Sequence, residues 1–124
     1  MKFPPIRFTK WYHWEERRGI KDSDSPGVYI LAKFANVPNG KTDYLNKWII
    51  YIGETCDQFL KRRWYQFDRS AFQHKPGSSG GRSYQKTYGD GGRNLYVSAF
   101  PVPNDFKGKR HLFIRFIERK LILY

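Results

Sequence analysis

The sequence predicts a small α+β domain in which helices pack on a three-stranded antiparallel sheet. Three segments rich in β-branched and aromatic residues, 27–34, 47–52 and 94–102, are typical of strands. Two segments with apolar residues at helical spacing, 57–73 and 109–124, are typical of helices. A length of 124 residues suits one compact domain, and 40% hydrophobic residues suffice to fill its core.

An N-terminal extension, 1–26, is expected to precede the main domain, 27–124. Within the extension, residues 9–18 predict a short helix that begins after Thr9 as N-cap. The expected order of elements is therefore helix, strand, strand, helix, loop, strand, helix.

The first two strands should pair as an antiparallel hairpin, because the turn-forming pair Asn39-Gly40 lies between them. The Gly/Ser-rich stretch 74–82 predicts a loop, and so does 89–93. The last predicted helix is apolar on almost every side, which indicates a buried helix.

Positive charge is the most distinctive feature of the composition. The chain has 23 Lys and Arg against 11 acidic residues, a net charge of +12. Such a surface attracts polyanions, and it favours nucleic acid over an anionic membrane or a merely basic surface. Cys56 is the single cysteine, so no internal disulfide forms. With no transmembrane pattern, a cytoplasmic protein is the simplest interpretation.

Two tyrosines lie on the strands that should pair. Tyr29 follows Gly27 by two positions, and Tyr51 precedes Gly53 by two. Phenol hydroxyls on a buried sheet need polar partners, so two of them at one place would form a polar spot. Each tyrosine alone is more simply structural, because aromatic residues favour strands.

Charged residues border the apolar stripes of both predicted helices. Arg63 flanks the stripe of the first helix, whereas Arg62 points almost opposite to it. A half-buried guanidinium needs an anion, either a structural carboxylate or a phosphate. Glu118 lies among apolar residues, and it would either pair with Arg63 or Arg115 or hold a hard cation such as Mg²⁺.

Four motifs follow one another with matching secondary structure: Gly27-Val28-Tyr29, Tyr51-Ile52-Gly53, the helical run 60–63 (LKRR), and Glu118 in a later helix. In their order and spacing they resemble the GIY-YIG endonuclease family. The resemblance covers the chain from Pro26 onward. The family's fold, a small sandwich around a three-stranded antiparallel sheet, agrees with the prediction from the residues.

The resemblance implies a metal-dependent endonuclease that hydrolyses phosphodiester bonds in DNA. Tyr29 would lie beside the attacking water as candidate general base, and Tyr51 would position that water or the phosphate. Arg63, or Arg62 if the register slips, would neutralise the phosphate, and Glu118 would hold one Mg²⁺ or Mn²⁺. A tyrosine, with a pKa of about 10, is a poor base unless nearby cations lower its pKa.

Two family features differ here. Phe67 stands where some members carry a histidine, and His74 could replace it. The sequence ends at Tyr124, before an asparagine that many members have, so a minimal or trimmed domain is expected. The stretch after the arginine helix resembles restriction-type members, which implies DNA contacts by Lys75, Arg82, Tyr84, Lys86 and Arg93.

The expected partner is DNA, cut by a monomer in two nicks or by a transient homodimer. Restriction is the first functional expectation; DNA repair and a mobile element are the others. A non-catalytic nucleic-acid-binding module is the main alternative, and an unrelated α+β protein is the third. The nuclease assignment requires Tyr29, Tyr51, Arg63 and Glu118 to meet in one pocket, and a carboxylate on the far side of the sheet would argue against it.

Overall fold

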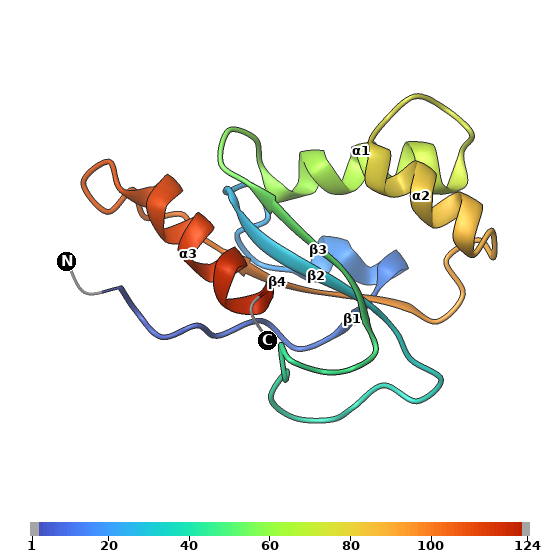
Figure 1. Ribbon diagram of the computed structural model, residues 1–124, viewed down its shortest axis with the longest axis horizontal. Coiled ribbons are helices and arrows are strands. Elements are labelled where there is room, and N and C mark those ends of the chain that lie inside the picture. The colour runs from blue at the N-terminus through green and yellow to red at the C-terminus, as the bar shows by residue number, and fades with distance from the viewer. Residues whose placement is uncertain (1–2, 123–124) are drawn as a thin grey trace.

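A computed structural model describes residues 3–122, which form one antiparallel sheet with helices against both of its faces (Figure 1). In chain order, the elements are β1 (Tyr12–His13), the 3-10 helix η1 (Trp14–Gly19), β2 (Gly27–Lys33), β3 (Ile49–Thr55), α1 (Leu60–Phe72), α2 (Ser79–Thr87), β4 (Leu95–Pro101) and α3 (Arg110–Ile122). The α+β class is thus as predicted.

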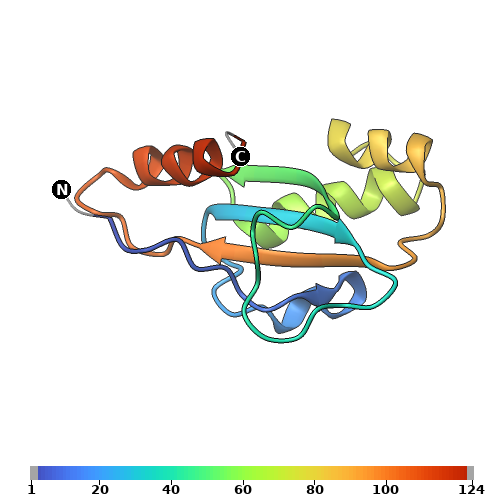
Figure 2. The ribbon, with the colours of Figure 1, turned by 60° about the horizontal axis from the view of Figure 1, so that its bottom comes forward.

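The sheet has the strand order β1-β4-β2-β3, with every neighbouring pair antiparallel. The predicted hairpin of β2 and β3 is confirmed, and Tyr29 lies between Gly53 of β3 and Ala99 of β4. The outer edge of β3 pairs with no other described strand (Figure 2). The backbone along this edge of β3 is therefore not covered by another described strand.

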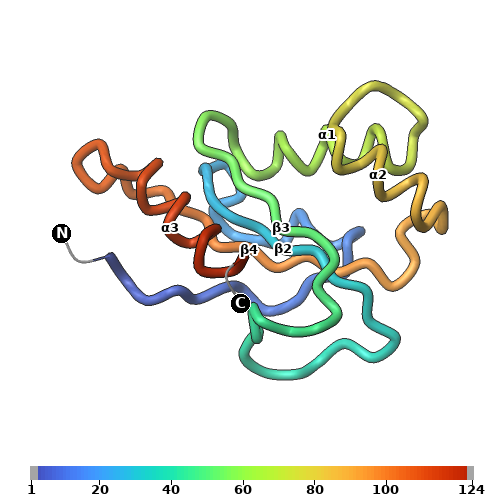
Figure 3. The backbone as a smooth tube through the Cα atoms, in the orientation of Figure 1, coloured from blue at the N-terminus to red at the C-terminus, as the bar shows by residue number. Residues whose placement is uncertain are grey.

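Alternate residues of β2 face two separate cores. Val28 and Ile30 pack with the apolar side chains of α3, whereas Tyr29 and Leu31 pack with those of α1. The period of two along a strand explains this division. The helices α1 and α3 consequently cover opposite faces of the sheet, on either side of β3 (Figure 3).

The N-terminal residues differ from the prediction. Residues 9–18 do not form the expected helix: a 3-10 turn covers only 14–19, and a fourth, two-residue strand precedes it. Thr9 is not an N-cap, because its backbone N–H donates to the Ala99 carbonyl at 2.9 Å and its hydroxyl accepts from the Ala99 N–H. These hydrogen bonds give partners to backbone groups on the edge of β4 that would otherwise be unpaired. Phe8 lies in the core with α3, so this part of the N-terminal segment packs against the main domain.

The helix α2 differs from the prediction, which expects a loop over 74–82. The Ser78 hydroxyl accepts a hydrogen bond from the Gly81 N–H at 3.1 Å and so caps the helix. A Cβ atom on Gly81 would lie 2.1 Å from the Ser70 Oγ and 2.6 Å from the Phe67 carbonyl oxygen. The glycines therefore serve close contact between α1 and α2 rather than a flexible loop.

The last helix is less buried than predicted. One stripe of α3 lies in the core, but Leu112, Phe116 and Ile122 are exposed. The α3 sequence is apolar on almost every side, but the helix is buried on one side only. No helix within residues 3–122 is long and apolar enough to cross a membrane.

Gly53→Ala should lower the free energy of unfolding by about 1–3 kcal/mol, as overpacked cores do. A Cβ atom there would lie 2.4 Å from the Tyr29 Cζ atom, and that ring is buried. Equilibrium urea unfolding measures the loss. Combining the change with Tyr29→Leu, which removes the ring, should abolish most of the added cost; strictly additive effects would contradict this cause.

Candidate functional site

Two tyrosines meet on the α1 face of the sheet, beside the edge strand. The rings of Tyr29 and Tyr51 are 5.9 Å apart between centroids; Tyr29 is buried and Tyr51 half-buried. Gly53 leaves room for the Tyr29 ring, and Gly80 of α2 does so for Tyr51, whose hydroxyl would be 2.8 Å from a Cβ atom there. The two phenols therefore lie side by side as the sequence predicted.

Arg63 approaches the Tyr29 phenol from α1. Leu60 and Trp64 of this helix are buried against the sheet, and Arg63 borders them half-buried, while Arg62 is exposed. The Arg63 guanidinium lies close enough to Tyr29 to act on its pKa. No ion-pair partner of Arg63 occurs among residues 3–122. Its positive charge is therefore available to an anion.

The pKa of Tyr29 shifts in the opposite direction to the one expected. Burial is the main cause that raises it far above its ordinary value, and the neighbouring Tyr51 phenol adds to the rise. Arg63 lowers the pKa of Tyr29, but its influence is smaller. Tyr29 therefore keeps its proton at neutral pH and offers a hydrogen-bond donor, not the phenolate that a general base requires.

Glu118 lies on the opposite face from these three side chains, because α3 packs against the other core. It borders the buried stripe of α3 and is itself half-buried. Burial raises the pKa of Glu118, the Glu54 carboxylate raises it further, and Arg115 opposes the shift. The single pocket that the nuclease assignment requires is thus not found: Tyr29 and Tyr51 meet on the face that Arg63 borders, and Glu118 can act with them only on a ligand that passes around the edge of β3.

The two groups are nevertheless connected through consecutive residues of β3. Gly53 contacts the Tyr29 ring, and the next residue, Glu54, interacts with Glu118 on the other face. Successive side chains of a strand point to opposite faces, which explains the division. Because β3 is the edge strand, both faces can be reached around its free side (Figure 2).

The carboxylates of Glu54 and Glu118 fit a hard divalent cation. They are negative groups brought together, and the charge of Glu118 is disfavoured by burial and by Glu54. A divalent ion would relieve both effects. Mg²⁺ commonly takes one or two carboxylates and keeps several waters, and no group of three or more His, Cys, Asp or Glu suited to a metal occurs within 3–122. Sequence reasoning missed Glu54, although it directly follows the YIG motif.

The predicted DNA-contacting residues are only partly brought together. Three of them share an open pocket of about 470 Å³ with His74, between the end of α1 and α2; they are Lys75, Arg82 and Lys86. His74 is thus grouped with these basic residues beyond the C-terminal end of α1, whereas Arg63 lies near its start. Arg93 is exposed outside this pocket, in the loop before β4.

The burial of Tyr84 does not favour the DNA contact expected of it. Its ring is buried between α1 and the sheet, and its hydroxyl donates to Asp90 Oδ1 at 2.8 Å. The Lys33 ammonium also donates to this hydroxyl, at 3.0 Å. Tyr84 therefore anchors α2 and the following loop to β2, and it presents no face to a ligand.

Glu118→Gln should stabilise the protein at neutral pH in metal-free buffer. The pKa of Glu118 is raised in the folded state, so the wild type loses stability as pH rises through that pKa, and the variant does not. Below about pH 4, the ordinary range for a glutamate, the two should unfold alike. Urea midpoints across this pH range measure the difference. The exposed control Glu16→Gln should show none, and a less stable Glu118→Gln at pH 7 would contradict the argument.

Comparison with known proteins leaves the site to be interpreted from its own residues. No protein-family model matches the chain, and neither the curated proteins nor the solved structures gave a match.

Proposed function

We propose that this protein is a metal-dependent endonuclease that hydrolyses phosphodiester bonds of DNA at the free edge of β3. The observation that carries the proposal is half-buried Arg63, whose charge acts on the Tyr29 phenol and which has no ion-pair partner among residues 3–122. Burying a cation is costly unless an anion meets it. A phosphate oxygen is a suitable anion, since arginine donates to phosphate in bidentate geometry.

The roles of the side chains follow from their protonation. Arg63 would offset the charge that develops on the phosphate, and such preorganised charge is usually a large part of catalysis. Half-buried Tyr51 would donate a hydrogen bond to a phosphate oxygen or orient the attacking water, and buried Tyr29, with its ring 5.9 Å away, would support the Tyr51 ring. Glu118, with Glu54, would hold Mg²⁺ or Mn²⁺; the ion supplies Lewis-acid stabilisation and lowers the pKa of a bound water. Because the metal-bound water would have a lowered pKa, no deprotonated tyrosine would be needed to activate it.

The DNA would be gripped beyond the reaction site, by the basic pocket of Lys75, Arg82 and Lys86. With a net charge of +12, the protein has a large electrostatic attraction for a polyanion. A restriction-like activity accords with this arrangement, and cutting both strands would take a transient dimer or two nicks.

A non-catalytic nucleic-acid-binding module is the second candidate. The placement of Glu118 on the opposite face from Arg63 favours it, because the carboxylate and the guanidinium would then act on different ligands. The basic pocket and the net charge serve this alternative equally well.

Glu118→Ala should abolish nicking of supercoiled plasmid in Mg²⁺ or Mn²⁺ while DNA binding in EDTA is retained. The loss should be at least about 100-fold, which is typical when a main electrostatic group is removed. Arg63→Ala should lose activity to a similar degree. Arg119→Ala is the matched control, since its side chain is exposed beside Glu118. Full cleavage by Glu118→Ala would refute the mechanism, and wild-type binding with no metal-dependent nicking would establish the binding module.

Lys75→Ala combined with Arg82→Ala should weaken DNA binding for all sequences alike. Each lost phosphate contact should reduce the slope of log affinity against log salt by about one. Anisotropy titrations at several salt concentrations measure this slope. Arg119→Ala combined with Lys120→Ala, on the outer face of α3, is the charge-matched control. An unchanged slope in the first variant would show that the pocket does not contact phosphates.

A further inference from the structure

We propose that the outer face of α1 binds an unpaired nucleotide, whose base stacks on Phe59 and whose phosphates contact Lys61 and Arg62. The inference rests on the nucleic-acid partner of the proposed function, and it concerns a surface outside the β3 edge site. It would direct the protein to DNA in which a nucleotide is unpaired near the reacting phosphate.

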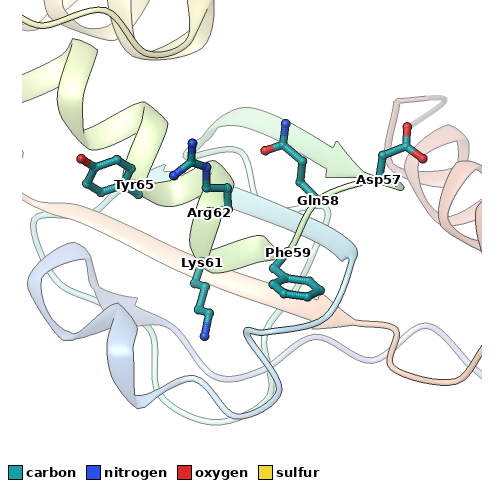
Figure 4. A pocket seen from close by; sticks show the side chains of 6 residues that line it. All are labelled: Asp57, Gln58, Phe59, Lys61, Arg62 and Tyr65. Atoms are coloured by element: carbon teal, nitrogen blue, oxygen red, sulfur yellow. The ribbon is translucent and has the colours of Figure 1, made fainter.

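An open pocket of about 650 Å³ marks this surface at the start of α1 (Figure 4). Phe59 and Tyr65 line it, and they are 51% and 47% exposed, so two large rings face solvent in one pocket. Phe59 is at the N-cap position of α1, where its side chain makes no capping hydrogen bond. No aromatic or cationic side chain within residues 3–122 stacks on the Phe59 ring, which leaves its face available.

One cation of this surface, Arg62, is held beside an aromatic ring. The Arg62 guanidinium lies 5.7 Å from the centroid of the Tyr65 ring, and Figure 4 shows these two side chains next to each other, with the Phe59 ring directed away from them. Arg69 lies at the same distance from that ring and donates to the Tyr65 hydroxyl at 3.2 Å. Tyr65 thereby restricts the positions that Arg62 takes beside α1.

A second recess next to the first is also lined by positively charged side chains. It has a volume of about 450 Å³, shares Lys61 and Tyr65 with the first, and adds Arg17 and Arg18 from η1. Within the part of the chain that the structure describes, no carboxylate pairs with Lys61, Arg62 or Arg18. These cations can therefore follow a nucleic-acid backbone across α1.

Few carboxylates lie at this surface. Asp68 accepts from the Trp14 indole at 2.8 Å and pairs with Arg17 at 3.6 Å. Asp57 lines the first pocket, is largely exposed and lies 3.7 Å from His111. The two recesses together are lined by four cations and one carboxylate, and this favours a polyanion.

An unpaired nucleotide suits this surface better than a duplex or an acidic peptide. The faces of paired bases are covered by their neighbours, whereas single-stranded DNA binds by stacking bases on exposed aromatic rings beside cations. An acidic peptide would use the cations and leave the Phe59 face uncovered. Arg62 and Arg63 are consecutive, so a strand leaving the β3 edge site needs only to pass the start of α1 to reach Phe59.

Anisotropy titrations in EDTA test the proposal with a labelled oligothymidine of about 12 nucleotides, a length within the usual site sizes. Phe59→Ala should weaken this binding about tenfold, which corresponds to one lost stacking contact, and leave binding of a blunt duplex unchanged. Phe59→Leu, which keeps an apolar side chain, should show the same loss. Trp48→Ala is the matched control, since Trp48 is 55% exposed, carries Lys47 over its ring at 5.4 Å, and lies outside both recesses.

The outcomes separate this proposal from the nuclease. Loss of oligothymidine binding by both Phe59 variants supports the inference whether or not the protein cleaves DNA. Unchanged binding by these variants, an equal loss for duplex, or a wild type that binds no oligothymidine would overturn it. Tighter, Phe59-dependent binding of poly-glutamate would overturn it in favour of an acidic protein partner.

Discussion

The contact between the Tyr29 ring and Gly53 is the constraint on which the candidate site depends. The ring occupies the space that any side chain at position 53 would fill, and it is held there by the two strands that flank β2. In this place Tyr29 is buried, and the burial keeps its hydroxyl protonated. The Tyr51 ring lies 5.9 Å away, and the Arg63 charge acts on the same phenol. A single missing side chain on β3 thus determines both the geometry and the chemistry of the phenol pair.

Beside an edge strand, side chains on both faces of the sheet can act on the same ligand. In a central strand, Gly53 and Glu54 would belong to separate compartments, each closed by neighbouring strands. At the free edge of β3, a chain-like ligand can pass around the strand and meet Arg63 on one side and the Glu54–Glu118 pair on the other. A small compact ligand would occupy one side alone, so the arrangement suits a long polyanion.

Features that depend on the local sequence pattern were predicted correctly, and features that depend on tertiary contacts were not. Helical periodicity placed Arg63 at the border of the buried face and Arg62 in solvent, and the turn signal predicted the hairpin; both are confirmed. The glycines before Tyr84 suggested a loop. In the structure they allow close contact with Ser70 and Phe67 of another helix, and this contact is not visible in the local sequence. The face that Glu118 occupies depends on which side of the sheet α3 crosses, and no pattern within the helix specifies that.

The close packing of α2 on α1 has a further consequence. At Gly81 the helices touch without room for a methyl group, so they behave as one body. Arg63 belongs to this body, and so does the basic pocket formed by Arg82 and Lys86. The distance between them is therefore fixed, and in the proposed function it would set how many nucleotides separate the phosphate held by the basic pocket from the one beside Arg63.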